Sequence, residues 1–221
     1  MQLPITTIIV IVTVLVSFGA FNNVKIYEDL IFYPPAVSKR RQWYRFFSSG
    51  LIHADGTHLL FNMFSLYMFG PFVEKEFTSL FAEQGKPLYL AMYVLALFFS
   101  LLPTYLKHKH NQYYRSLGAS GAVSAVIFAG LLLAPGIEVG LFFIPPFIPG
   151  FIFAPLYLGL SIYLERRGKD NINHSAHIWG AVFGMLFTFI LAKLLADTNV
   201  FQEFVNEVQY YMMVKGWIPR S

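Results

Sequence analysis

The chain has 221 residues, of which 56% are hydrophobic, 18% aromatic and only 13% charged, and its mean hydropathy is +0.55. Soluble domains carry about 25% charged residues, so this composition excludes an ordinary soluble protein and favours a membrane protein. The absence of cysteine excludes disulfide bonds, thiolate catalysis and cysteine-ligated metal centres. In so apolar a chain the net charge of +4 fits a lipid bilayer better than nucleic acid, and we expect no nucleic-acid partner.

Stretches free of Asp, Glu, Lys and Arg mark candidate membrane spans, because a charge at the bilayer centre costs about 2.5–3.5 kcal/mol on insertion scales. Six such stretches occur, each near the roughly 20 residues that cross a bilayer. They are residues 3–21, 57–73, 87–106, 116–136, 139–164 and 175–192. The pattern predicts an all-α polytopic membrane protein with six transmembrane helices.

The first stretch differs from a signal peptide. No basic residue precedes it, since the first lysine is Lys25, and no small-residue cleavage site follows it. We therefore expect a retained first helix. The segment 22–56 behind it is too long for a simple connection and is expected to have structure or function of its own.

The fourth stretch is short of good helical residues. Gly118 and Gly121 at its start and Pro135-Gly136 at its end leave residues 120–133. At 1.5 Å per residue this helix is about 21 Å long, against a hydrocarbon core of about 30 Å. Non-helical backbone inside a bilayer must be buried in protein or reached by water. The sequence therefore predicts a water-accessible cavity at the N-terminal end of this short, central fourth helix.

Behind the sixth stretch, apolar residues keep helical spacing and Trp217 follows them. They are Phe201, Phe204, Val205, Val208 and Met212. This pattern predicts an amphipathic helix at the membrane interface. We expect two regions, a six-helix membrane domain at 1–196 and an amphipathic C-terminal tail at 197–221.

Three groups of polar and small residues lie inside the predicted spans, where such residues are functional candidates. The groups are His58 with Asn62, then Gly118-Ala119-Ser120-Gly121, and finally Ala176 and His177 with Gly180 and Gly184. Taken singly they have structural explanations, because a serine bonds to its own helix and paired glycines serve helix packing. If the small-residue stripes of the fourth and sixth helices meet, His177 lies beside Ser120 as a general base beside a nucleophile.

The motifs HxxxN, GxSG and AHxxGxxxG, in this order and on alternate spans, resemble the rhomboid intramembrane serine proteases. The resemblance extends over residues 43–192 and is specific, because three motifs occur in the right order. Further matches are Arg45, eight residues before His53, and Gly70 with Glu74 at the end of the second span.

The resemblance implies a minimal six-span rhomboid bundle that cleaves transmembrane proteins without a cofactor or metal. Ser120 would attack the scissile carbonyl while His177 takes and returns the proton. His58, Asn62 and the backbone N–H of Ser120 would hold the oxyanion. Structural support would come from Gly118, Gly121, Gly180, Gly184 and Arg45. The protein would be an integral, multi-pass membrane protein, of the cell membrane in a prokaryote.

One position departs from the family pattern. In many rhomboids an aromatic residue four positions after the serine packs on the catalytic imidazole, and here that residue is Ser124. His177 must then be oriented by another group, such as His174 or an aromatic residue of the fifth span. Tyr44 stands where a tryptophan commonly precedes the loop arginine. The departure at Ser124 keeps open an alternative, a catalytically inactive rhomboid-like protein that binds client membrane helices.

Other classes fit less well. HExxH is absent and no intramembrane aspartate pair exists, which argues against zinc and aspartyl intramembrane proteases. A metal site built from His174 and His177 with His108 or His110 would lack a carboxylate or thiolate ligand. A transporter would explain the proline-rich entry to the fifth span, but signs of an inverted repeat are missing. No particular client or oligomeric state is indicated.

Two considerations about membrane orientation disagree. The loops on the active-site side, after spans one, three and five, carry 11 of the 16 basic residues, which the positive-inside rule places in the cytoplasm. The resemblance implies the opposite, since rhomboid sites usually open away from the cytoplasm. We expect the family orientation, because Arg45 belongs to the loop structure and the basic residues 166–169 lie next to Glu165 and Asp170.

Overall fold

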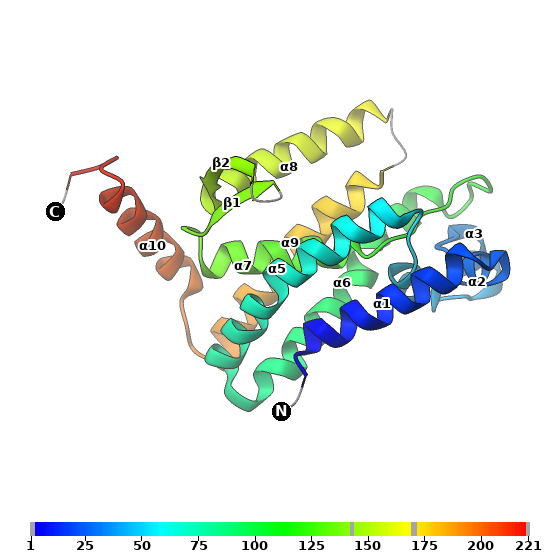
Figure 1. Cartoon of the computed structure of the whole chain (residues 1–221), viewed down its shortest axis with the longest axis horizontal. Coiled ribbons are helices and arrows are strands. Elements are labelled where there is room, and N and C mark those ends of the chain that lie inside the picture. The colour runs from blue at the N-terminus through cyan, green and yellow to red at the C-terminus, as the bar shows by residue number, and fades with distance from the viewer. Residues whose placement is uncertain (1–2, 142–143, 169–171, 220–221) are drawn as a thin grey trace.

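The structure, a computed structural model, describes residues 3–141, 144–168 and 172–219. Its helices are α1 (Ile5–Phe21), α2 (Val24–Leu30), α3 (Pro34–Arg40), α4 (Arg45–Ser48), α5 (Gly56–Phe81), α6 (Gly85–His108), α7 (Ser120–Leu133), α8 (Gly150–Arg167), α9 (His174–Leu195) and α10 (Val200–Val214). Short 3-10 turns lie at Ser49–Leu51 and Ala82–Gln84. Helices α5, α6, α7 and α9 pack together, while α1 and α8 lie on opposite sides of α7 (Figure 1).

Two stretches are long and apolar enough to cross a membrane. The first runs from Gly56 to His108 and contains α5 and α6, and the second is α9. Helices α1 and α7 are apolar but shorter. Helix α7 covers 14 residues, and its bounds coincide with the predicted 120–133. Helix α5 continues well beyond the predicted end of the second span at 73, because the charged residues there do not interrupt the helix.

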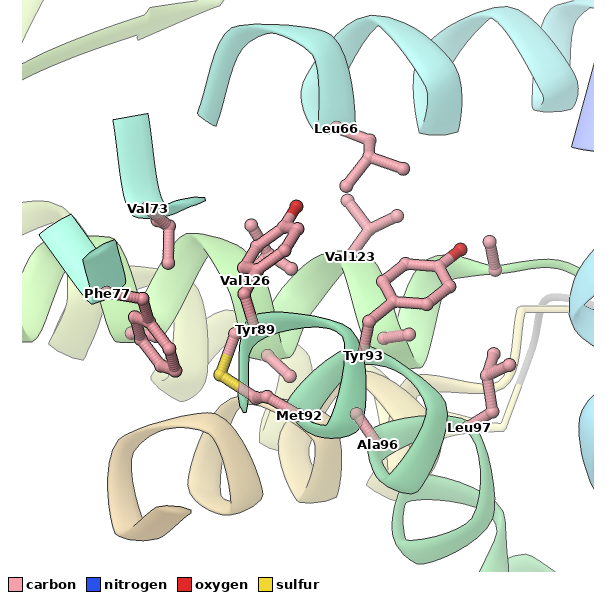
Figure 2. Packing of buried hydrophobic residues seen from close by; sticks show 14 of the residues in the cluster. Leu66, Val73, Phe77, Tyr89, Met92, Tyr93, Ala96, Leu97, Val123 and Val126 are labelled. Atoms are coloured by element: carbon pink, nitrogen blue, oxygen red, sulfur yellow. The ribbon is translucent and has the colours of Figure 1, made fainter. Parts of the chain in front are cut away.

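The interior of the bundle is filled by apolar side chains from α5, α6 and α7 (Figure 2). They include Leu66, Val73 and Phe77 of α5, Tyr89 and Met92 of α6, and Val123 and Val126 of α7. In a bilayer such packing stabilises the protein through van der Waals contact, since lipid tails are as apolar as these side chains.

A buried carboxylate attaches α1 to α5. Glu74 accepts hydrogen bonds from the backbone N–H of Ile5 at 2.9 Å and of Thr6 at 3.1 Å, and from the Thr6 hydroxyl at 3.1 Å. The first N–H groups of a helix lack partners within it, and a negative charge at this end is favourable. Gly70 lies one turn earlier, where a Cβ atom would collide with the Thr6 side chain. The pair Gly70 and Glu74 is therefore explained by the docking of α1.

The prediction that the fifth span begins at 139 is wrong. Strand β1 (Glu138–Leu141) pairs antiparallel with β2 (Ile144–Pro149), and α8 begins only at Gly150. Three prolines between 145 and 149 have no backbone N–H, which disfavours an α-helix there. The hairpin also corrects the all-α expectation. Residues 142–143, within that predicted span, lie outside the described residues, as do Lys169 and Asp170 of the following loop.

The long segment 22–56 has structure of its own, as expected. It contains α2, α3, α4 and a 3-10 turn. The buried Arg45 donates to the carbonyl oxygens of Glu28 at 2.8 Å and Ile31 at 2.7 Å, and to Gln42 Oε1 at 2.6 Å. Its guanidinium thus joins the end of α2 to α4.

Helix α10 forms where an amphipathic tail was expected, and it stands at the end of the molecule next to the hairpin (Figure 1). Val200 is buried against the bundle. Tyr211 and Trp217 form ring contacts with Phe151 at the start of α8, with centroids 5.6 and 6.4 Å apart. The tail therefore packs on the same end of the fold as the hairpin.

Candidate active site

A cavity of about 1200 Å³ opens between α5, α7, α8 and α9, at the N-terminal end of α7 where a cavity was predicted. Its lining includes all four polar side chains that the motifs indicated, Ser120, His177, His58 and Asn62. Ser120 and His177 are half-buried and Asn62 is only 6% exposed. Residues from three helices, separated by up to 119 positions in the sequence, thus face one space.

Helices α7 and α9 approach each other closely through glycine. A Cβ atom on Gly180 would collide with the carbonyl of Gly121, and one on Gly184 would lie 2.6 Å from the Cα atom of Ala125. The predicted meeting of the two small-residue stripes is therefore present. Ser120 is adjacent to Gly121, and His177 lies one turn before Gly180. Both residues consequently stand beside the same helix contact and at the same end of the two helices.

The backbone before Ser120 requires glycine. Gly118 has φ +109°, a left-handed conformation, and a Cβ atom there would lie 2.8 Å from Cε1 of His58. The first hydrogen bond of α7 runs from the Val123 N–H to the Ala119 carbonyl. The N–H of Ser120 therefore has no partner within the helix and is available to a negative charge in the cavity.

His58 and Asn62 are held by local hydrogen bonds of α5. Asp55 caps the helix and accepts the backbone N–H of His58 at 2.8 Å. Nδ1 of His58 faces the backbone N–H of Ala54 at 3.5 Å, which assigns the ring proton to Nε2. Nδ2 of Asn62 donates to the His58 carbonyl at 3.0 Å and retains a second N–H. Each side chain can thus offer one donor to the cavity.

His53 was only a matching position in the sequence, but the structure gives it a defined place. It is fully buried, its Nδ1 lies 3.0 Å from the Ser17 hydroxyl, and its Nε2 accepts the backbone N–H of Ala119 at 3.4 Å. Because Ser17 donates its own proton to the Leu51 carbonyl, Nδ1 of His53 is the donor in their contact. The ring therefore connects α1 to the residue before Ser120. The only sequence signal for it was its spacing of eight residues after Arg45, which gave no role to the ring.

One of the two groups proposed to orient His177 contacts its ring, and the other lines the cavity. The ring of buried His174 meets that of His177 edge to face, with centroids 5.8 Å apart and an interplanar angle of 81°. Tyr157 of α8 lines the cavity, and its hydroxyl lies close to Ser124. Ser124, at the position where an aromatic residue is usual, is thus in contact with an aromatic residue of the fifth span.

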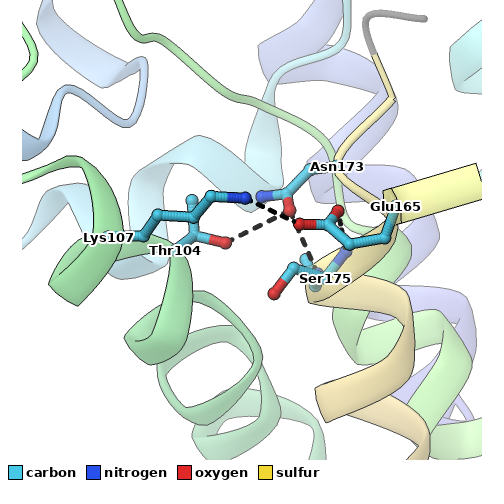
Figure 3. Close-up of polar contacts among 6 residues, drawn as sticks. Thr104, Lys107, Glu165, Asn173 and Ser175 are labelled. Carbon is cyan, nitrogen blue, oxygen red and sulfur yellow. Dashed lines mark hydrogen bonds and ion pairs between the residues drawn. The ribbon is translucent and has the colours of Figure 1, made fainter. Parts of the chain in front are cut away.

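The start of α9, just before His177, is fixed by a polar cluster (Figure 3). The Asn173 side chain caps the helix by accepting the Ala176 N–H at 3.1 Å, and Thr104 of α6 donates to the same oxygen. Glu165 of α8 accepts the Ser175 N–H at 3.1 Å and pairs with Lys107 at 3.0 Å. Three helices therefore meet within one turn of His177.

The described part of the chain contains no group of three or more His, Asp or Glu side chains that could hold a metal ion. The alternative of a zinc site at His174 and His177 with His108 or His110 therefore has no complete ligand set in the described residues.

The three motifs lie within a longer match, because the Rhomboid domain family matches residues 40–194. The chain belongs to the rhomboid family. It is similar to the rhomboid protease GlpG of Haemophilus influenzae, with 27% identity over 169 residues, which are 75% of this chain and 78% of that protein. The putative rhomboid protease YdcA of Bacillus subtilis is 27% identical over 154 residues, 69% of each chain.

A plant relative matches over a smaller share of its length. RHOMBOID-like protein 12, mitochondrial, of Arabidopsis thaliana is 30% identical over 153 residues, which are 61% of this chain and 42% of that protein. Rhomboids are integral membrane proteins, in agreement with the apolar helices of this one. Relatives named as proteases and relatives named only as rhomboid-like both occur, so the family alone does not fix the activity of this rhomboid.

Proposed function

We propose that this rhomboid is an intramembrane serine endopeptidase that cleaves transmembrane segments through a Ser120–His177 dyad. The observation that carries the proposal is the backbone contact of Gly121 with Gly180, which brings the helix ends bearing Ser120 and His177 to one cavity. A nucleophile and a general base that face the same cavity are the two groups that acyl transfer requires.

In this mechanism His177 removes the proton of the Ser120 hydroxyl as its oxygen attacks the substrate carbonyl. The negative charge that develops on the carbonyl oxygen is received by the N–H of Ser120 and by the side chains of His58 and Asn62. His177 then gives its proton to the leaving amine, and water hydrolyses the acyl-enzyme by the same route.

We further propose that α1, α5, α6, α7, α8 and α9 are six transmembrane helices of a domain at 1–196. At about 21 Å, α7 is too short to cross the hydrocarbon core, so its N-terminal end lies below the membrane surface. The cavity there would supply the water that hydrolysis needs. The proposed substrates are proteins with a single transmembrane helix, which enters the cavity from the bilayer.

A serine-directed fluorophosphonate probe tests the proposal. We expect the probe to label the purified protein, and peptide mapping to place the label on Ser120. The alternative, a rhomboid-like protein that binds client helices without cleaving them, is favoured by Ser124 at the aromatic position. An unlabelled protein that still binds membrane helices would establish that alternative.

The oxyanion donors should give a graded loss. Replacing Asn62 by alanine should lower the rate of cleavage by about 10²-fold, because one of three donors is removed. His58→Ala should cost as much or more, since His58 also packs against Gly118. Probe labelling of Ser120 should survive in Asn62→Ala, and its complete loss would show that Asn62 acts on the structure instead.

The membrane orientation is testable because the chain contains no cysteine. Single cysteines are placed at Lys39 in α3 and at Glu83 between α5 and α6, both exposed and at opposite ends of the bundle. With a membrane-impermeant maleimide on intact cells, we expect labelling at 39 and none at 83, with both labelled after permeabilisation. The reverse pattern would place the active site on the cytoplasmic side.

A further inference from the structure

The cavity continues well beyond Ser120. It extends along α7, whose residues line it from Ser120 to Ile127, and it reaches the hairpin, where Glu138 of β1 and Ile148 of β2 line it. Between the two ends its walls are largely apolar, with Met68 of α5 and Ile127 of α7 among them. Figure 1 shows the hairpin at the end of α7 that is opposite to Ser120. The largely apolar cleft therefore has the carboxylate of Glu138 at its hairpin end.

Helix α10 holds this carboxylate in place. Oε1 of Glu138 accepts hydrogen bonds from the Tyr211 hydroxyl at 3.0 Å and from Nζ of Lys215 at 2.7 Å. The Lys215 ammonium lowers the pKa of Glu138, so the side chain is ionised at neutral pH. Both contacts use the same oxygen, and no hydrogen bond or ion pair between described residues uses Oε2. The side chain is 43% exposed, so a further cation can reach it.

The length of α7 fixes how far along a substrate this carboxylate lies. Helix α7 has 14 residues, a rise of about 21 Å. A substrate helix that lies beside α7, with its cleaved bond at Ser120, therefore reaches the hairpin about 14 residues further on. Transmembrane helices carry an excess of lysine and arginine at their cytoplasmic ends. In the expected orientation the hairpin lies at that end.

We propose that Glu138 is a specificity-determining residue, which binds a lysine or arginine about 14 residues from the cleaved bond at the far end of a substrate's transmembrane helix. This inference rests on the proposed protease function. Cleavage would thus depend on a feature at the opposite membrane surface as well as on the residues around the cut.

The test compares single-span substrates that differ at one position, 12 to 16 residues into the helix from the cleaved bond. Lysine, glutamine or glutamate is placed there in turn. For the wild-type protein in lipid vesicles we expect kcat/KM for lysine to exceed that for glutamate by about tenfold at the best position, since attraction and like-charge rejection add. Glutamine should lie between them.

Three variants locate the effect. The double variant Glu138→Lys, Lys215→Glu keeps an ion pair between hairpin and α10 but reverses the charge in the cleft, so it should prefer glutamate. Glu138→Gln should reduce the preference to near one. The control Glu203→Gln makes the same charge change as Glu138→Gln, but at a position on α10 where the side chain is exposed and does not line the cavity, and it should retain the lysine preference. The preference is the ratio of kcat/KM for two substrates measured with the same variant. A general loss of activity lowers both values equally and leaves the ratio unchanged.

Equal cleavage of the three substrates by the wild type would overturn this inference alone. So would a double variant that still prefers lysine, or a Glu203→Gln variant that loses the preference as fully as Glu138→Gln. If the wild type cleaves none of the substrates and Ser120 is not labelled by the fluorophosphonate probe, the proposed function fails and this inference fails with it.

Discussion

Alanine at Ser120 or at His177 is expected to lower the rate of substrate cleavage by on the order of 10⁶-fold, and the double variant should be little worse than either single one. The two residues act as one unit, because the serine is a weak nucleophile without the base and the base has no other proton to take. Cleavage of a single-span substrate in detergent and in vesicles measures the effect.

The fold should survive both changes, since each side chain faces the cavity and is only half-buried. Thermal unfolding in detergent should therefore match the wild type. Ser124→Ala is the matched control, one turn further along α7, and should retain cleavage. Cleavage by Ser120→Ala together with loss in Ser124→Ala would show that the nucleophile has been assigned wrongly.

Leucine at Gly184 is expected to abolish cleavage and to destabilise the protein by about 3 kcal/mol. A side chain at this position would meet the backbone of Ala125, which cannot move aside as a flexible side chain can. Helices α7 and α9 would separate, and Ser120 and His177 with them. The measurements are the rate of cleavage and the midpoint of thermal unfolding in detergent.

Gly159→Leu provides the control for Gly184→Leu. Gly159 also lies inside a helix, but a Cβ atom there would meet nothing within 4 Å. We expect this variant to keep its thermal midpoint within a few degrees of the wild type. If Gly184→Leu behaves in the same way, the close contact of α7 and α9 is not what sets the geometry of the site.

Local signals in the sequence predicted the bounds of α7 and its close contact with α9. The bounds 120–133 follow from glycines and a proline next to the helix, which act over one or two residues. The contact of α7 with α9 could be predicted because small residues at helical spacing let backbones approach. The predicted start of the fifth span was wrong, because counting uncharged residues cannot distinguish an apolar hairpin from an apolar helix.

The polar contacts between distant segments could not be predicted. His53 meets Ala119 across 66 positions, and Glu138 meets Lys215 across 77. Glu74 lies at the edge of a predicted span, where a charge would ordinarily face water, yet it caps α1 from inside the protein. Each contact depends on how helices are placed relative to one another, which one-dimensional periodicity does not contain.

Helix α8 is fastened at both of its ends. At one end Glu165 bonds to the start of α9 and to Lys107, and at the other the Phe151 N–H bonds to the Pro135 carbonyl at 2.9 Å. Between them, Pro155 interrupts the helical hydrogen bonds and Gly159 faces open space. A helix that is held at both ends and interrupted near its middle bends most easily at the interruption. Widening of this side of the cleft is therefore expected as a bowing of α8 about Pro155, with both anchors in place, rather than as an outward swing of the whole helix.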